Sequence, residues 1–587
     1  MCGIVGYKGK NNPKEFLLEG LKNLEYRGYD SSGIALKLGN NIQIIKSVGK
    51  ISCLEEKIDS EGLIDSCIGI AHTRWATHGV PSEKNAHPHR IGKVTLVHNG
   101  IIENASELKE QLLNEGVIFN SDTDTEVACA VINKYYDGDP VKAIELAISK
   151  LKGSYAFCIL FDDFDKLYAV RKDSPLVVGI GDSEFYVASD IAAIISYTNK
   201  YILLEENEIA EIDDLVNVSK DGIHIEKTIM MASITADSKD KCGYDHYMLK
   251  EIMEEPIVLE KTFRTYWDDM EKLPDLSCYE EIHIVACGSA MYAGMIGKIL
   301  LEEKAGIRVV CEVASEYRYK KVIYDRKTLV ILISQSGETA DTIAAMRKAK
   351  LAGIETLAIV NVVGSTIARE SNRQIFIEAG PEIAVATTKA YMLQAAMLSL
   401  LSYKAALAKG YKNDNVIEEL KSLPRMVKEI IDRRDDYKKI ALDIYKSNDV
   451  FFIGRKIDYA VSLEGSLKLK EVSYTHSEAY QAGELKHGTI SLIDDGIPVI
   501  SIITDKNIME KTLSNVEEVK ARGAKCIVIS NEEILGYDHL IVVPKMCDFF
   551  QALLVVPCIQ LIAYEVALLR NCDIDKPKNL AKSVTVE

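Results

Sequence analysis

The chain has 587 residues, of which 47% are hydrophobic and 27% are charged, a composition that is ordinary for a globular protein. At about 150 residues per domain, this length predicts roughly three or four domains rather than one core. The net charge of -17, with no run of Lys and Arg interleaved with aromatic residues, argues against a nucleic-acid partner.

The 13 cysteines are scattered and include no CxxC pair, so the sequence indicates neither a zinc site nor a disulfide framework. We therefore expect a reducing, cytoplasmic location, and the amino terminus lacks the pattern of a signal peptide. Residues 549–569 are apolar enough to suggest a transmembrane helix. They contain Gln551, Pro557, Gln560 and Glu565, which favour a buried packing helix and no membrane contact.

The chain begins Met1-Cys2-Gly3-Ile4-Val5-Gly6, which makes Cys2 a candidate nucleophile. If Met1 is removed, Cys2 carries both a thiol and a free α-amine, with reference pKa values of about 8.5 and about 7.7–8.0. One residue then holds a nucleophile and a proton acceptor, and no separate histidine base is required. The alternative is a buried, inert cysteine.

Up to about residue 213 the sequence predicts an α+β domain with stacked sheets. Residues 13–25, 103–114 and 124–136 have the apolar spacing of helices. Apolar runs predict strands at residues 68–71, 94–97, 155–161, 167–170, 176–180 and 185–188.

Three polar segments follow these elements, at residues 71–79 after a strand, 98–100 at a strand end and 121–126 at a helix start. Together they could bind a free amino acid. Arg74 can grip an α-carboxylate, Asp124 can pair with an α-ammonium, and Asn99 with the Gly100 amide can form an oxyanion hole. The alternatives are a surface charge, a capping box and an Asn-Gly turn.

Histidines at positions 72, 78, 87, 89 and 98 invite a metal interpretation. They lack HExxH spacing, so we expect no metal and no cofactor.

Four motifs carry a resemblance to a known family: residues 2–6, 24–31, 72–79 and 98–100. They resemble the glutaminase domain of amidotransferases with an amino-terminal cysteine nucleophile. The resemblance implies the four-layer αββα fold of N-terminal-nucleophile hydrolases and attack of Cys2 on the glutamine amide. It implies that glutamine is held by Arg74, Thr77, His78, Gly100 and Asp124, that Asn99 and Gly100 stabilise the oxyanion, and that Trp75 gates an ammonia passage. For Trp75, ordinary core packing is the alternative.

The second half of the chain alternates strands and helices as doubly wound α/β sheets do. Residues 281–288 and 449–454 are apolar strands ending at Gly, and residues 328–334 and 356–361 parallel residues 498–504 and 525–530. Corresponding points are about 165–170 residues apart, which predicts two copies of one unit.

Hydroxyl-rich loops begin two helices of the first copy. In residues 334–339 three hydroxyls, a glycine and the first helix amides form a cradle suited to a phosphate monoester. Residues 385–389 open another helix with paired hydroxyls. Each loop can also be read as a simple N-cap.

In the second copy, Glu464, Lys468 and Glu471 share one helical face. They are either a solvated salt-bridged face or acid/base machinery that moves a proton between sugar carbons. His487 offers a titratable imidazole in a Gly-bounded loop, and residues 573–587 lack periodicity, as a frayed tail would.

Residues 334–339, 385–389, 464–471, 483–488 and 579–587 resemble the paired sugar-isomerase domains of the glucosamine-6-phosphate synthase family. The resemblance implies amination of fructose-6-phosphate by glutamine, giving glucosamine-6-phosphate and glutamate, the first step of hexosamine synthesis. The sugar-phosphate contacts it implies are Ser289, Ser334, Gln335, Ser336, Thr339, Val385 and Thr387.

The same resemblance implies chemical roles for four further residues. Glu471 would be the base for proton transfer between C1 and C2, with Lys468 assisting. His487 would open the sugar ring from the neighbouring subunit of a homodimer, and Lys582 would form a Schiff base with the ketone.

The implied domains are a glutaminase domain at 1–230, a linker at 231–246, sugar-isomerase domains at 247–425 and 426–572, and a catalytic tail at 573–587. One departure from the family pattern affects the sugar site, because Ala290 stands where a serine is usual. A lost neutral hydrogen bond is worth about 0.5–1.5 kcal/mol, so we expect weaker sugar binding but retained activity.

Overall fold

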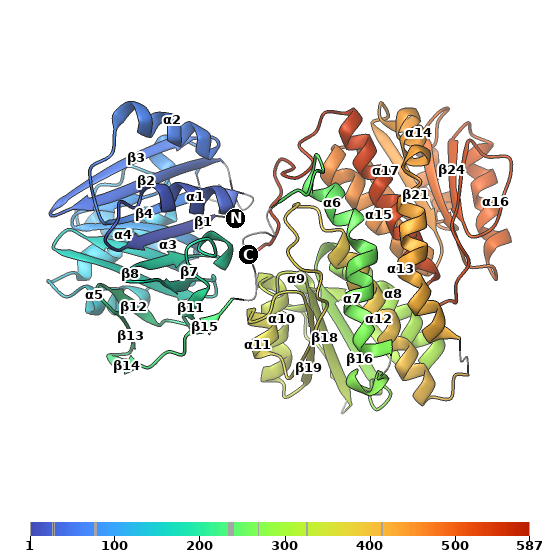
Figure 1. Cartoon of the computed structure of the whole chain (residues 1–587), viewed down its shortest axis with the longest axis horizontal. Helices are drawn as coiled ribbons and strands as arrows, with labels where there is room; N and C mark the ends of the chain where they lie inside the picture. The colour runs from blue at the N-terminus through green and yellow to red at the C-terminus, as the bar shows by residue number, and fades with distance from the viewer. Residues whose placement is uncertain are drawn as a thin grey trace. The chain divides into compact units, whose positions relative to one another are not determined.

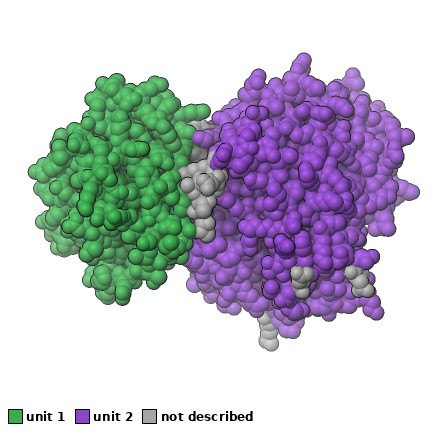
Figure 2. Space-filling view, viewed as in Figure 1, with its two compact units in different colours: residues 1–239, 583–587 green, residues 240–582 purple. Residues whose placement is uncertain are grey.

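The computed structural model describes residues 2–25, 28, 30–75, 79–232, 240–267, 269–324, 327–412 and 415–585. The chain forms two compact units, coloured separately in Figure 2, of which unit 1 comprises residues 1–239 and 583–587 and unit 2 comprises residues 240–582. The predicted linker at 231–246 spans the division between them.

Unit 1 contains two antiparallel sheets with helices on their outer faces (Figure 1). The first sheet has the order β15-β11-β9-β10-β1-β4-β2-β3 and the second β14-β13-β12-β8-β7-β6-β5. The strands of the first sheet are β1 (Gly3–Lys8), β2 (Ser31–Leu38), β3 (Asn41–Val48), β4 (Ile68–Arg74), β9 (Val177–Ile180), β10 (Phe185–Ala188), β11 (Lys200–Leu203) and β15 (Met230–Met231). Those of the second are β5 (His89–Ile91), β6 (Val94–Ile102), β7 (Gly153–Phe161), β8 (Phe164–Lys172), β12 (Ile209–Ile212), β13 (Val216–Lys220) and β14 (Ile223–Ile225).

The side chains of β7 explain why the two sheets stack. Ala156, Cys158 and Leu160 belong to the core between the sheets. Phe157 and Ile159 point the other way, into the core under the helices. A strand buried on both faces reads as a continuous apolar run because alternate side chains reach opposite layers.

The helices complete the four layers. The first sheet packs on α1 (Lys14–Leu24) and α2 (Ile51–Glu61), and the second on α3 (Ala105–Asn114), α4 (Asp124–Tyr135) and α5 (Pro140–Ile148). The αββα prediction is confirmed, as are the three predicted helices of this half.

Unit 2 contains two parallel five-stranded sheets of identical topology, β17-β16-β18-β19-β20 and β22-β21-β23-β24-β25. The strands of the first copy are β16 (Glu281–Ala286), β17 (Arg308–Val313), β18 (Thr328–Ser334), β19 (Glu355–Val360) and β20 (Arg373–Phe376). Those of the second are β21 (Asp449–Gly454), β22 (His476–Gln481), β23 (Pro498–Ile503), β24 (Lys525–Ser530) and β25 (His539–Val542). The predicted repeat is therefore confirmed.

Helices enclose both sheets. The first copy has α8 (Gly288–Ala305), α9 (Ala314–Tyr317), α10 (Ala340–Leu351), α11 (Thr366–Glu370) and α12 (Lys389–Ala408). The second has α15 (Ile457–Ser473), α16 (Met509–Lys520) and α17 (Val556–Leu569), while α6 (Tyr247–Met253), α7 (Glu255–Trp267), α13 (Val416–Ile431) and α14 (Arg434–Ile444) pack around both copies.

One hydrophobic core joins the two copies, because α12 and α17 are apolar on almost every face and contribute to it throughout their length. Residues Gln551–Leu569 are long and apolar enough to cross a membrane, but 89% of their apolar window is buried inside the protein. The prediction of a buried packing helix is confirmed.

Candidate active sites

Cys2 lies at the start of β1, the strand between β10 and β4 in the first sheet. The Trp75 backbone N–H donates to Cys2 Sγ over 3.2 Å, and Asn99 Nδ2 donates to the Cys2 carbonyl oxygen over 2.9 Å. Burial raises the pKa of the Cys2 thiol. The thiol therefore needs a proton acceptor beside it before it can act as a nucleophile.

Gly100 sits inside a strand rather than in a turn. We expected residues 98–100 to end a strand, but β6 continues to Ile102 and the segment lies within it. The φ angle of Gly100 is +135°, and a Cβ there would lie 2.1 Å from the Ser154 carbonyl oxygen. Only glycine fits position 100, so this Asn-Gly pair lies within a strand and does not mark a turn.

His72, on β4, fixes the orientation of the Asn99 side chain. Its Nε2 lies 3.1 Å from Asn99 Oδ1 and 3.0 Å from the His98 carbonyl oxygen. Both partners are oxygens, so Nε2 carries the proton. Burial lowers the pKa of His72 to about 3, so the ring is neutral and holds Asn99 with its NH₂ group toward Cys2. Sequence reasoning considered His72 only as a metal ligand and missed this contact.

His87 and His89 are also buried in the core. Burial lowers the pKa of His87 and of His89 well below the usual value, and His87 stacks on His72 with ring centroids 4.0 Å apart. Among the described residues, no group of three or more His, Cys, Asp or Glu side chains could hold a metal ion.

Arg74 and Asp124 place opposite charges near Cys2. Arg74 ends β4 and is 3% exposed, and Asp124 begins α4 and is 7% exposed. Burial dominates the raised pKa of Cys2, while Arg74 lowers it and Asp124 raises it. Opposite charges beside a thiol suit a zwitterionic amino acid. Thr77 and His78 lie outside the described residues.

The capping alternative for residues 121–126 is also correct. The Thr123 hydroxyl accepts a hydrogen bond from the Glu126 backbone N–H, and the Glu126 carboxylate accepts one from the Ser121 backbone N–H in return. The Asp124 carboxylate takes no part in these two bonds and accepts from the Ile102 backbone N–H over 2.9 Å. The same segment therefore caps α4 and presents a carboxylate at the site.

In unit 2, the hydroxyl-rich loop lies at the carboxyl end of β18. Ser334 Oγ lies 2.9 Å from Thr339 Oγ1 and accepts from the Gly337 backbone N–H over 3.0 Å. Gly337 has a φ of +67°, and a Cβ there would lie 2.0 Å from Ser365 Oγ. The loop is folded by its own hydroxyls, and Gln335, Ser336 and Thr339 are half-buried at its rim. Such a nest before a helix suits an anion.

Val385 and Thr387 lie in a second loop, which leads into α12. Val385 is 8% exposed, and its backbone N–H donates to the Asp575 carbonyl oxygen over 3.0 Å. Thr387 is half-buried, and its hydroxyl donates to Glu382 Oε2 over 2.7 Å. The loop is therefore tied both to the tail and to a buried carboxylate.

Glu464, Lys468 and Glu471 lie together on α15, and the burial of the first two excludes a solvated salt-bridged face. Glu464 and Lys468 are 0% exposed, so the face is buried rather than solvated. Lys468 Nζ is 3.6 Å from Glu464 and donates to Glu471 Oε2. Burial raises the pKa of Glu464 to about 8. For Lys468 burial opposes the charged form, but the two carboxylates raise its pKa overall.

Ser289 connects this helix to the first copy, because its hydroxyl donates to Glu464 Oε1 over 3.1 Å. Ala290, beside it on α8, is half-buried against the common core. His487 ends the short 3-10 turn Leu485–His487 and is exposed to solvent.

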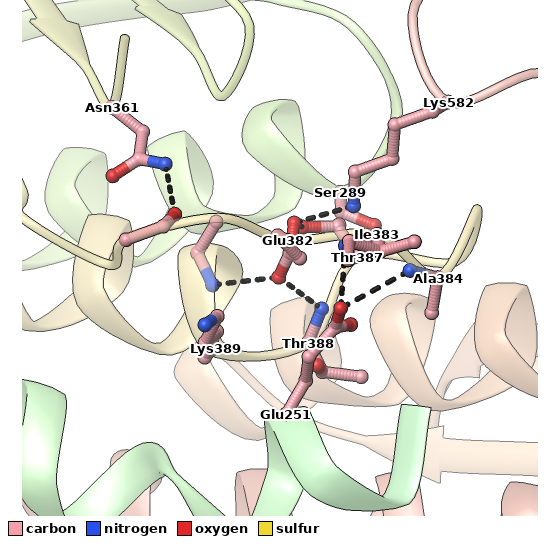
Figure 3. Close-up of polar contacts among 12 residues, drawn as sticks. Glu251, Ser289, Asn361, Glu382, Ile383, Ala384, Thr387, Thr388, Lys389 and Lys582 are labelled. Atoms are coloured by element: carbon pink, nitrogen blue, oxygen red, sulfur yellow. Dashed lines mark hydrogen bonds and ion pairs between the residues drawn. The ribbon is translucent and has the colours of Figure 1, made fainter. Parts of the chain in front are cut away.

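The tail is held down rather than frayed. The Asp575 carboxylate accepts from the Tyr247 and Met248 backbone N–H groups at the start of α6, each over 2.9 Å. Lys582 Nζ donates to Glu382 Oε2 over 2.5 Å, as Figure 3 shows. Sequence reasoning missed Glu382, since a single glutamate in a loop carries no signal of its own.

Comparison with known proteins extends these observations to the whole chain. The family model "Glutamine amidotransferase domain" matches residues 72–196, and the model "SIS domain" matches residues 275–403 and 443–567. A glutamine–fructose-6-phosphate aminotransferase (isomerizing) of Clostridium tetani is 48% identical, with 100% of both chains covered. The chain belongs to the glutamine–fructose-6-phosphate aminotransferase (isomerizing) family.

Two other relatives agree with this assignment. The family member from Thermus thermophilus is 42% identical, also over 100% of both chains. The solved C-terminal domain of glucosamine-fructose-6-phosphate aminotransferase from Francisella tularensis is 35% identical, with a TM-score of 0.55, covering 57% of this chain and 99% of that one. The family thus accounts for the paired sheets of unit 2 and for the amidotransferase unit that precedes them.

Proposed function

We propose that this chain transfers the amide nitrogen of glutamine to fructose-6-phosphate and isomerises the product to glucosamine-6-phosphate, releasing glutamate. The observation that carries the proposal is the full-length similarity to the family, at 48% identity with both chains completely covered. The two clusters of polar side chains, one in each unit, support it because each suits one half of this reaction.

In unit 1, Cys2 is the nucleophile that attacks the glutamine amide. Its own α-amine, freed by removal of Met1, takes the thiol proton that burial otherwise retains. Asn99 Nδ2 and the Gly100 backbone N–H stabilise the oxyanion, since His72 already holds the Asn99 amide toward Cys2. Arg74 and Asp124, with Thr77 and His78, hold the carboxylate and ammonium of glutamine.

In unit 2, the loop after β18 binds the phosphate through Ser334, Gln335, Ser336 and Thr339. Its support is the hydroxyl and amide lining at the carboxyl end of a parallel strand, where ligands of such sheets bind. The remaining sugar contacts in the proposal come from Ser289, Val385 and Thr387.

Glu471 is the base that moves a proton between C1 and C2. The buried ammonium of Lys468, which donates to Glu471, stabilises the negative charge that develops on the sugar. Lys582 forms a Schiff base with the ketone. His487 opens the sugar ring bound by a neighbouring subunit, so the proposal includes a homodimer. The His487 side chain is exposed to solvent in its own chain, which supports this role.

The nitrogen must move between the sites as ammonia, because ammonium is not nucleophilic. We include in the proposal an ammonia passage gated by Trp75, whose backbone N–H contacts the Cys2 thiol. Trp75→Ala is then expected to hydrolyse glutamine but to yield less than one glucosamine-6-phosphate per glutamate. One glucosamine-6-phosphate formed per glutamate released in that variant would contradict the gating role of Trp75.

A cytoplasmic location completes the proposal, supported by the absence of any disulfide among the 13 cysteines, all of which lie in the described part of the chain. One assay tests the central claim. Purified protein is given glutamine and fructose-6-phosphate, and glucosamine-6-phosphate and glutamate are both measured. Equal amounts of the two are expected. Binding of the sugar without aminosugar would indicate a sensor, and amination of another ketose phosphate only would indicate a related enzyme.

A further inference from the structure

Glu382 is a buried carboxylate with an unusually complete set of partners. It is fully buried, and its Oε1 accepts from the Thr388 and Ala390 backbone N–H groups, each over 3.0 Å. Its Oε2 accepts from the Thr387 hydroxyl and from Lys582 Nζ. The carboxylate is therefore fixed in place at the start of α12, and one of its oxygens faces the amine of the tail.

Lys582 reaches this carboxylate from the far end of the chain. Its side chain is 6% exposed, and Figure 3 shows it extending from the tail down to Glu382. Asp575 holds the same tail at the start of α6. The structure thus places the amine with one specific acceptor, in the loop that also contains Thr387.

We propose that Glu382 is a catalytic residue that carries the proton of Lys582 during formation of the Schiff base and then serves as counter-ion of the iminium. The inference rests on the proposed function, in which Lys582 reacts with the ketone of the sugar phosphate. It adds an acid/base partner for that step, at a residue in direct contact with the reacting nitrogen.

The step balances with no external reagent. Glu382 takes one proton from the Lys582 ammonium, and the neutral amine forms a C–N bond to the carbonyl carbon. A second proton moves from nitrogen to the former carbonyl oxygen to give a carbinolamine. Glu382 then returns its proton to the hydroxyl, which leaves as water, and the protonated imine remains beside the carboxylate. The Lys582 ammonium and the Glu382 carboxylate have no net charge before the reaction, and the iminium and the carboxylate have none after it. The buried site therefore gains no charge.

In the resting state the surroundings favour the carboxylate form of Glu382 beside the Lys582 ammonium. Burial opposes the charged carboxylate, whereas Lys582 and the loop contacts hold the pKa of Glu382 at about 2. Once the proton has moved, the neutral pair no longer bears the cost of buried charge. Other charged or titratable groups that act here are Glu251 on α6, Glu255 on α7, Lys389 on α12 and Lys468 on α15. Burial raises the pKa of Glu251 and of Glu255, which disfavours a negative charge on either beside the Glu382 carboxylate.

Reductive trapping tests the proposal directly. Full-length protein is incubated with fructose-6-phosphate and borohydride at several pH values, and the reduced adduct is measured by intact mass. Glu382→Gln is expected to trap at least about 100-fold more slowly, the size typical of a lost general acid–base group. Its trapping is expected to accelerate with rising pH, because the Lys582 proton must now leave to solvent, whereas the wild-type rate stays flat. Glu382→Asp should recover part of the rate.

Glu251→Gln is the matched control. Glu251 Oε1 accepts from the Ile383 and Ala384 backbone N–H groups, so it supports the same loop without a hydrogen bond to Lys582. This variant should trap within about fivefold of wild type. An equal loss of trapping rate in Glu382→Gln and Glu251→Gln would assign Glu382 a structural role and overturn the proposal. A trapping rate of Glu382→Gln that does not change with pH would do the same.

The same experiment separates this inference from the proposed function. Wild-type trapping that is abolished by Lys582→Ala supports the Schiff base itself. If wild type makes glucosamine-6-phosphate without any adduct, the Schiff base fails and the Glu382 proposal falls with it. If wild type and Glu382→Gln trap equally fast, only the Glu382 proposal falls.

Discussion

Replacing Asn99 with aspartate tests the proposed oxyanion hole with almost no change in side-chain shape. In the native structure Asn99 Nδ2 donates to the Cys2 carbonyl oxygen over 2.9 Å, and Oδ1 accepts from His72. Aspartate keeps the acceptor toward His72 but loses the donor. It also turns a carboxylate oxygen toward the place where negative charge develops during attack on the amide.

The expected loss is large. Removing one oxyanion donor typically costs about 2.7–4 kcal/mol, a factor of roughly 100–1,000 in kcat. Asn99 is 8% exposed, so water has little access to replace the lost donor. We therefore expect Asn99→Asp to hydrolyse glutamine at least about 100-fold more slowly, mainly through kcat, because the substrate charges are bound by other residues.

Glutamate release at saturating glutamine measures this loss, with fructose-6-phosphate isomerisation as an internal control that should not change. Asn104→Asp is a matched variant, since Asn104 lies at the start of α3 and donates to the Lys150 carbonyl oxygen outside the site. It should retain near-normal hydrolysis. Loss of less than about fivefold in Asn99→Asp, with a normal melting temperature, would refute the oxyanion role.

Three further predictions concern the other side chains of the two sites. Cys2→Ala should abolish glutamine hydrolysis while sugar isomerisation persists, and residual glutaminase activity would contradict the nucleophile assignment. Gly337→Ala should raise the KM for fructose-6-phosphate at least about tenfold without affecting glutaminase, because its Cβ would meet Ser365 Oγ at 2.0 Å; an unchanged KM would argue against the phosphate loop. Burial raises the pKa of Glu464 to about 8, compared with about 4.3 in the unfolded chain. The contribution of Glu464 to the free energy of unfolding is therefore fully present at low pH. It declines by up to about 1.4 kcal/mol per pH unit as the pH rises toward 8. The melting temperature of Glu464→Gln should therefore fall less than that of wild type between about pH 5 and pH 8. Parallel plots of melting temperature against pH for the two proteins would contradict this.

The local sequence pattern was sufficient to predict most helices and strands and the repeat of the α/β unit. Apolar runs predicted β18, β21 and β24 at their observed bounds, because parallel strands buried on both faces are apolar throughout their central positions. Residues 98–100 were misplaced at a strand end, since an Asn-Gly pair normally signals a turn. Here the close approach of the Ser154 carbonyl oxygen, a contact 54 residues away in sequence, is what requires glycine at position 100.

By itself the sequence determined the order of the units, the doubled α/β architecture and the chemistry available at Cys2 and in the loop after β18, because these depend on residue type and local periodicity. Only the tertiary structure decided which side chains are protonated and which hydrogen-bond partners they have. It buried His72 so that a neutral ring orients Asn99, removed the face of α15 from solvent, and brought Lys582 to Glu382 across 200 residues of sequence. The reason is physical: desolvation and hydrogen-bond partners depend on which distant segments pack together, and no local pattern records that.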